Sequence, residues 1–382
     1  MRVLLVLLLM LGAGPARAES DPADSARQAI EALGEAAQEL QAAEKSRDRV
    51  AALTQTIHAY EVGLDAMREG LRRATIREAA IRGVFEAERD QLSRLLGAMS
   101  SIGRAPAPAS LLHPGGPLDA VRTGMVTAQL VPALQDRAEE LRRALAEIAA
   151  IRQVQESAVS VLEEGLAGAE RARVALSQAI SDRVDLPRRY YADPENVAAL
   201  ANATETLDAF AKGLMELDWL PQDAADAVRL ASATDFSAQK GSLPLPVLGQ
   251  VLRRYLEADA AGITRPGVIL ATRPRALVSL PAPATIRYAG PLTDYGNVVI
   301  AEPAEGVLLV LAGLGQVFVR AGDVLEGRAP VGLMPGAAEN AQEVLIQAGQ
   351  GNATSQTETL YIEVRLDGSP VDPAEWFALG VQ

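Results

Sequence analysis

Two long stretches of the chain carry hydrophobic residues at the alternating three- and four-residue spacing of an α-helix. The first covers residues 24–99, with apolar positions such as Leu33, Leu40 and Ile57 separated by charged residues. Such spacing, sustained over many turns, is typical of a coiled-coil helix, and one extra step of three near Val50 indicates a local stammer. We therefore predict one long helix whose apolar seam needs a partner.

The same spacing returns over residues 134–183, for example at Leu141, Leu145 and Ile148. The intervening residues 100–117 contain four prolines and three glycines, which exclude a continuous helix. Two seams joined by one loop favour an antiparallel hairpin within the chain, which we predict for residues 19–186. A parallel dimer of each helix is the alternative.

The loop between the two helical stretches is rich in hydrophobic residues for a simple turn. We expect short helices near residues 100–133 to cap the far end of the hairpin. The side chains there either pack among themselves or form a docking surface for a membrane partner. The candidate docking residues are Leu111, Leu112, Leu118, Val121 and Met125.

Residues 187–240 form a separate helical segment. Pro194 marks a helix start, and the following residues, including Leu207, Phe210 and Leu214, give the helix one apolar face. The segment is either a connector packed on the hairpin or a movable arm that lies across the C-terminal domain.

The last part of the chain, residues 241–382, changes to short runs of β-branched residues bounded by Gly, Pro or Asp. These runs are residues 268–270, 297–300, 307–311 and 316–319. Runs of this kind predict strands separated by turns, so the region is expected to be a compact β-rich domain. The whole chain is thus predicted to be an α+β multidomain protein.

The N-terminal residues 1–18 combine one arginine, a short apolar run and a small-residue pattern before Glu19. This arrangement is typical of a cleaved secretory signal peptide, and the apolar run is too short to span a bilayer. An uncleaved anchor is the alternative. We expect an exported protein.

Composition narrows the class of partner. Aromatic residues make up 4% of the chain, and the formal net charge is -13. The low aromatic content agrees with long helices rather than one large globular core. The negative charge argues against nucleic acid or anionic lipid as the main partner and favours a protein or a neutral polymer.

Short motifs in the C-terminal region follow one another in a characteristic order. They are Pro266, Gly267 and Val268; Tyr288 and Gly290; Asp294, Tyr295 and Gly296; Ala321 to Val324; and the run from Leu360 to Arg365. In this order they resemble a LytM-type, or lysostaphin-like, zinc metallopeptidase domain. The resemblance implies a β-rich fold with a duplicated hybrid motif.

The resemblance also implies which positions carry chemistry in active members, where His and Asp side chains bind zinc and further His side chains act in catalysis. Those positions fall on Arg265, Ile269, Gly313, Thr359 and Tyr361, so each one is replaced here. Zinc sites draw three or four ligands from Cys, His, Asp and Glu. The chain has no Cys and only two His, both far upstream, so we expect neither a metal nor a cofactor, and no enzymatic activity.

Taken together, the signal peptide, hairpin, arm and LytM-like domain resemble the EnvC-type murein hydrolase activators. The resemblance implies a non-catalytic periplasmic protein of the division septum that activates zinc-dependent N-acetylmuramoyl-L-alanine amidases during the splitting of septal peptidoglycan. It implies that the hairpin tip contacts the periplasmic loop of an FtsEX ABC complex. It further implies that the arm covers the amidase-binding groove at rest.

The residues that line the amidase-binding groove of such activators can be assigned to positions of this sequence one at a time. Ile269, Tyr295, Tyr361 and Arg365 match in kind, and Arg265 supplies a charge that some activators place one residue later. The alternative is that Tyr361 and Arg365 are ordinary strand residues. For the whole protein, the alternatives are a passive peptidoglycan-binding scaffold and an active LytM-type endopeptidase.

Overall fold

The computed structural model describes residues 22–43, 45–103, 117–182, 194–203, 206–217, 236–259, 262–349 and 358–378. Contacts divide the chain into two compact units. The first comprises residues 1–66, 165–340 and 354–382, and the second comprises residues 67–164 and 341–353. The predicted signal peptide lies outside the described residues, and the four predicted segments stay a prediction.

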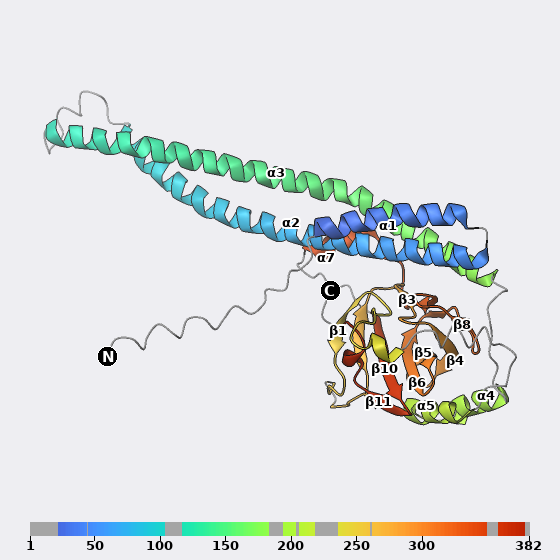
Figure 1. Ribbon diagram of the computed structural model, residues 1–382. Helices are drawn as coiled ribbons and strands as arrows, with labels where there is room; N and C mark the ends of the chain where they lie inside the picture. Colours follow the sequence, from blue (N-terminus) through green and yellow to red (C-terminus); the bar gives the residue numbers. More distant parts are fainter. Residues whose placement is uncertain are drawn as a thin grey trace, which may run out of the picture. The chain divides into compact units, whose positions relative to one another are not determined.

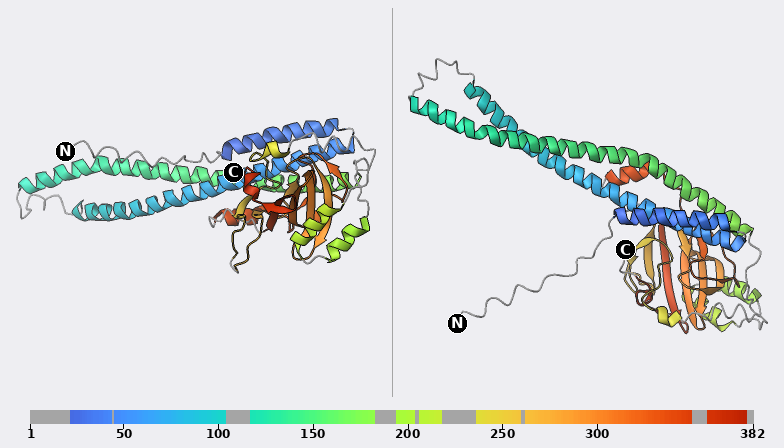
Figure 2. Two further views of the ribbon diagram at one scale, coloured as in Figure 1. Left: turned by 60° about the horizontal axis from the view of Figure 1, so that its bottom comes forward. Right: turned by 45° about the horizontal axis from the view of Figure 1, so that its top comes forward.

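The helix predicted over residues 24–99 is divided in two, so the prediction of one helix was wrong. Helix α1 (Pro22–Ala42) ends, and helix α2 (Ser46–Gly103) begins four residues later. Within the first unit, α1 lies along the beginning of α2 (Figure 2). A Cβ atom on Gly63 would lie 3.2 Å from that of Ala29, so two small residues let the helices approach closely.

Helix α3 (Pro117–Ser181) pairs with α2 in the antiparallel sense. In the first unit, Arg173 of α3 contacts Glu61 of α2 at 2.9 Å. In the second unit, successive ion pairs join α3 to α2 in reverse order: Arg152 to Glu78, Arg77 to Glu147 and Arg137 to Glu88. These contacts agree with a hairpin, whereas coiled-coil packing of its seam stays a prediction.

The expected short helices at the tip are not seen in the described part of the chain. Leu118, Val121 and Met125 belong instead to the first turns of α3, whose first residue is a proline, as suits a helix start. Met125 is 64% exposed, and the other two side chains fall outside the description. Leu111 and Leu112 lie outside the described residues. None of the described helices is long and apolar enough to cross a membrane.

The predicted arm contains two helices, α4 (Pro194–Ala203) and α5 (Leu207–Glu216). Pro194 starts the first helix as expected. The second starts anew because Thr206 caps it, with the Thr206 side chain accepting a hydrogen bond from the N–H of Ala209 at 3.2 Å. Both helices lie at the side of the β sheet within the first unit (Figure 1).

Strands occupy three of the β-rich runs, the first half of the run 316–319, and several further segments of the C-terminal region. The larger, eight-stranded sheet is antiparallel, with the order β1-β2-β10-β6-β5-β4-β8 and with β11 paired to β10. Its strands are β1 (Gly249–Arg253), β2 (Val268–Thr272), β4 (Ala284–Leu292), β5 (Gly296–Ala304), β6 (Val307–Leu314), β8 (Val324–Leu325), β10 (Glu358–Leu366) and β11 (Ser369–Val371).

The smaller sheet has the order β3-β9-β7 and consists of β3 (Leu277–Ser279), β7 (Gln316–Val317) and β9 (Pro330–Leu333). The connection between β9 and β10 carries helix α7 (Ala341–Gly349), which no pattern predicted and which belongs to the second unit. Short 3-10 helices span Phe236–Gln239 and Pro373–Glu375. The chain therefore combines long helices with an antiparallel β domain.

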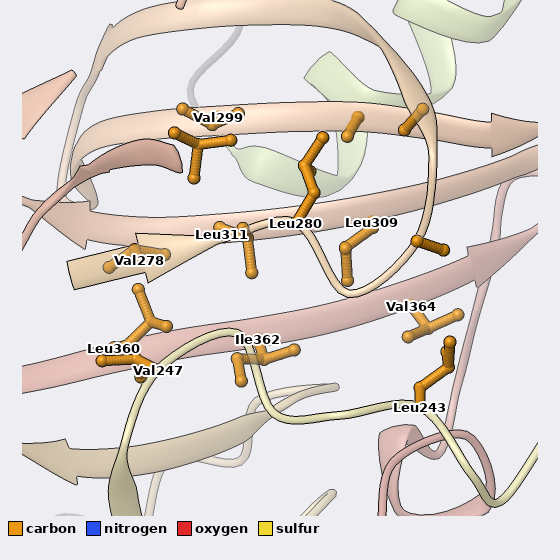
Figure 3. Packing of buried hydrophobic residues seen from close by; sticks show 14 of the residues in the cluster. Leu243, Val247, Val278, Leu280, Val299, Leu309, Leu311, Leu360, Ile362 and Val364 are labelled. Atoms are coloured by element: carbon orange, nitrogen blue, oxygen red, sulfur yellow. The ribbon is translucent and has the colours of Figure 1, made fainter. Parts of the chain in front are cut away.

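The large sheet is buried on both faces. On the inner face, Leu360, Ile362 and Val364 of β10 pack with residues such as Leu309 of β6 and Leu280 (Figure 3). Because side chains alternate along a strand, the neighbouring residues of β6 and β10 point to the opposite face. Burial on both faces explains why β6 is an almost continuous apolar run instead of an alternating one.

Candidate partner-binding face

Helix α5 covers the outer face of the large sheet with its apolar side. Leu207, Phe210, Ala211 and Leu214 are all buried, at the spacing that places them on one face of a helix. They join a cluster with outward-facing sheet residues, which we call the covered face: Leu292, Val298, Ile300, Leu308, Val310, Ala312 and Tyr361, with Ile269, Tyr288 and Tyr295 at its margin. The ring of Phe210 meets that of Tyr288 edge to face, with 4.7 Å between centroids.

Two arginines of the sheet hold the two ends of α5. At its beginning, Asp208 pairs with the guanidinium of Arg365, which holds the pKa of the Asp208 carboxyl below its ordinary value, with Lys212 adding to the effect. At its end, Arg287 donates hydrogen bonds to the carbonyl oxygens of Leu214 and Leu217, the latter at 3.0 Å. The last carbonyls of a helix lack partners within it, so Arg287 satisfies groups that would otherwise be buried unpaired.

A row of three polar side chains on β10 runs from Tyr361 to Arg365, the residue that pairs with Asp208 of α5. The hydroxyl of Tyr361 donates to Glu363 Oε2 at 2.6 Å, and Arg365 donates to Glu363 Oε1 at 2.6 Å. Glu363 and Arg365 are 1% and 0% exposed, so the row is sealed from water. Burial raises the pKa of Glu363, although its hydrogen bonds from Tyr361 and Arg365 oppose that change. Burial, and then the nearby Glu363, raise the pKa of Tyr361, which therefore stays a hydrogen-bond donor.

The remaining predicted face residues gather around Tyr361. Ile269 of β2 lies opposite Tyr361 in the strand register. The ring centroids of Tyr295 and Tyr361 are 5.8 Å apart, and the guanidinium of Arg265 lies 5.4 Å from the Tyr295 ring centroid. The Tyr361 ring also lies over Gly267, where a Cβ atom would come within 2.5 Å of it. The structure thus brings together four of the predicted residues, and Arg365 lies four residues further along β10.

The positions that the LytM resemblance assigns to zinc binding (Arg265, Ile269 and Tyr361) and to catalysis (Gly313 and Thr359) also lie close together, but their side chains do not fit a metal. Gly313 has φ +98, and a Cβ atom there would lie 2.6 Å from the carbonyl oxygen of Thr359. With Arg265, Ile269 and Tyr361, this set offers neither an imidazole nor a carboxylate. In the described ranges, no group of three His, Asp or Glu side chains is placed to bind a metal ion.

Sequence reasoning missed the polar partners of the covered face, namely Asp208, Arg287 and Glu363. A signal was present for two of them, because Arg287 and Glu363 interrupt otherwise apolar strands. A charge inside such a strand indicates a buried partner. The spacing of residues along the sequence did not predict which residue that partner would be.

No family model matches the sequence. A protein of Neisseria meningitidis serogroup B described as uncharacterized is 27% identical over 153 residues, which are 40% of this chain and 23% of that protein. The chain therefore spans less than a quarter of that relative.

Similar solved structures include two peptidases. A zinc-containing peptidase from Vibrio cholerae is 14% identical with a TM-score of 0.28, over 35% of this chain and 40% of that one. A putative peptidase M23 from Pseudomonas aeruginosa is 15% identical with a TM-score of 0.27, over 44% of this chain and 68% of that one.

Proposed function

We propose that the chain is a non-catalytic activator of zinc-dependent N-acetylmuramoyl-L-alanine amidases that split septal peptidoglycan during cell division. The observation that carries this proposal is that an amphipathic helix of the same chain packs in one apolar cluster with the sheet face that bears Tyr361 and Ile269, two positions that the LytM resemblance assigns to zinc binding. A face that already receives one amphipathic helix has the shape and chemistry to receive another. In this proposal, the amidase supplies the zinc and performs the hydrolysis.

The chemistry of α5 supports a cover that can be exchanged. The helix has only 10 residues, and helices of that length are marginal in water without tertiary contacts. Its order therefore depends on docking. Its two polar attachments, Asp208 to Arg365 and Arg287 to Leu214, are contacts that a competing helix with an acidic first turn can reproduce.

The location and the upstream partner complete the proposal. The signal-like residues 1–18 direct the chain to the periplasm, where it acts at the septum. The loop end of α2 and α3 contacts the periplasmic loop of an FtsEX-like ABC complex, for which the exposed Met125 is the described contact candidate. In this proposal, peptidoglycan itself is a further ligand. A partner at that end shifts the docking equilibrium of α5 only by its differential affinity for the two states.

Release of dye-labelled peptidoglycan fragments by the amidase of the same organism tests the proposal. Asp208→Lys sets a cation against Arg365 and is expected to raise amidase stimulation by the full chain. Glu216→Lys makes the same charge change on an exposed position of α5 and is the matched control. Combining Asp208→Lys with Arg365→Ala, which cannot re-form an ion pair with α5, is expected to abolish the stimulation, because Arg365 contacts the amidase in this proposal.

Two outcomes contradict this function. Binding of the chain to cell wall without stimulation by any variant identifies a passive scaffold. Release of fragments in the absence of amidase identifies an active endopeptidase, and metal analysis of the purified chain then has to find zinc.

A further inference from the structure

The turn between β2 and β3 contacts both long helices of the first unit. Arg273 donates from Nε to Asp65 Oδ1 of α2 at 2.6 Å. Two residues later, Arg275 lies 2.6 Å from Glu170 of α3. The two arginine side chains are 16% and 28% exposed, so both ion pairs are partly shielded from water.

Next to this turn, a buried carboxylate joins the helix pair to the backbone of β3. Glu61 of α2 is 8% exposed. Its Oε1 accepts a hydrogen bond from the N–H of Leu277 at 2.9 Å and another from Arg173 of α3 at 2.9 Å. Leu277 also packs in one apolar cluster with α2 and α3 residues such as Ile57 and Leu176. The helices are therefore attached to β3 by both polar and apolar contacts.

The same turn touches the strands that bear the covered face. Thr272, the last residue of β2, donates a hydrogen bond to the carbonyl oxygen of Glu358, the first residue of β10, at 3.4 Å. A Cβ atom on Gly336 would lie 2.8 Å from Cβ of Pro274 and 3.1 Å from the carboxylate of Glu358. The turn is therefore in contact with the adjoining ends of β2 and β10.

The backbone of the turn is held in a strained conformation. Arg275 has φ +59, a region that residues other than glycine rarely adopt. Its N–H donates to the carbonyl oxygen of Pro335 at 3.0 Å, and its side chain pairs with Glu170. Loss of the Glu170 contact removes one of the interactions that keep this conformation.

We propose that the β2–β3 turn transmits movement of the helix pair to the covered face, so that release of Arg273 and Arg275 from α2 and α3 loosens the docking of α5. Ile269 of β2 and Tyr361 of β10 form the route, because they pair across the strands and belong to the cluster that contacts α5. The inference deepens the proposed function and rests on α5 being a displaceable cover.

The absence of cysteine from the sequence allows a direct measurement of α5 docking. Ala211 of α5 is 0% exposed, so the thiol of an Ala211→Cys reporter reacts with a soluble reagent only when α5 leaves the sheet. In this background, Asp65→Arg or Arg273→Asp is expected to speed labelling of the full chain about tenfold. The double reversal, Asp65→Arg with Arg273→Asp, is expected to restore slow labelling when Glu339→Gln also removes the second carboxylate near Arg273, which lies at 3.6 Å.

Two further variants make the measurement specific. Glu147→Arg removes the exposed contact of Glu147 with Arg77 between the same helices and is expected to leave labelling unchanged. Glu170→Gln removes the charged partner of Arg275 without reversing a charge, and it replaces the reversals if those variants fail to fold.

The outcomes separate this inference from the proposed function. Unchanged labelling in the folded single variants, or double reversal that does not restore slow labelling, overturns the inference. Stimulation of the amidase by Asp208→Lys would then still support the activator. Faster labelling without any amidase stimulation supports the inference and contradicts the activator.

Discussion

Replacing Phe210 by alanine removes the largest apolar side chain that α5 places on the sheet. Phe210 is 0% exposed, and its ring contacts Tyr288 edge to face at an interplanar angle of 76°. If α5 is a displaceable cover, the lost contact weakens the docking of this helix and leaves the rest of the β domain folded.

The size of the effect follows from the burial. Truncation of a fully buried Phe to Ala costs about 3–5 kcal/mol, which includes the loss of its aromatic pair. Because about 1.4 kcal/mol corresponds to a tenfold change in an equilibrium constant, the lower value weakens docking about 150-fold. The undocked fraction rises by that factor while docking remains the favoured state.

Thiol labelling of the Ala211→Cys reporter measures this fraction in the full chain. Phe210→Ala is expected to raise the labelling rate about 100-fold or more, as long as opening and closing are fast relative to labelling. Lys212→Ala on the exposed side of α5 is the control. It removes only an i,i+4 pair with Asp208, worth about 0.3–0.5 kcal/mol, and is expected to change the rate less than about threefold.

The opposite result would refute the reasoning. If Phe210→Ala labels slowly, and the whole domain instead unfolds at a lower urea concentration, α5 is an integral layer of the β domain. The face beneath it would then not be available to a partner.

Two further predictions concern stability. Burial lowers the pKa of His58, the Arg328 charge adds to this, and the Glu61 carboxylate opposes it, so the folded chain takes up a proton on His58 at a lower pH than the unfolded chain does. The free energy of unfolding is therefore expected to fall as the pH drops below about 7, and to fall less steeply in His58→Gln. An equal pH dependence of the two free energies in urea unfolding would contradict this. Gly267→Ala places a methyl group 2.5 Å from the Tyr361 ring and is expected to cost about 1–3 kcal/mol in the same assay, whereas Gly34→Ala, with no atom within 4 Å, is expected to stabilise α1.

Periodicity alone predicted much of the local structure. The spacing of Leu207, Phe210 and Leu214 indicated a helix with one apolar face, and the β-branched runs indicated strands. It did not place the break between α1 and α2. Because helical spacing continues across the break with only a shift near Val50, the sequence pattern resembled one interrupted heptad series.

The polar contacts are different in kind, since charge pairing between distant segments leaves no local pattern. Asp65 and Glu170 read as ordinary solvated charges of a long helix, yet each meets an arginine of the β2–β3 turn. The same is true of Asp208, whose partner Arg365 lies 157 residues away. Only a folded chain shows that these charges face one another.

The sequence by itself therefore determined the segment types, the apolar side of α5 and the lack of Cys and His residues in the C-terminal region, because these depend on residue identity and on spacing within a few turns or strands. The tertiary structure decided what the apolar side covers, which charges are buried together, and how the helix pair attaches to the β2–β3 turn. Such contacts form between residues far apart in the chain, and their stability depends on burial that the sequence pattern does not contain.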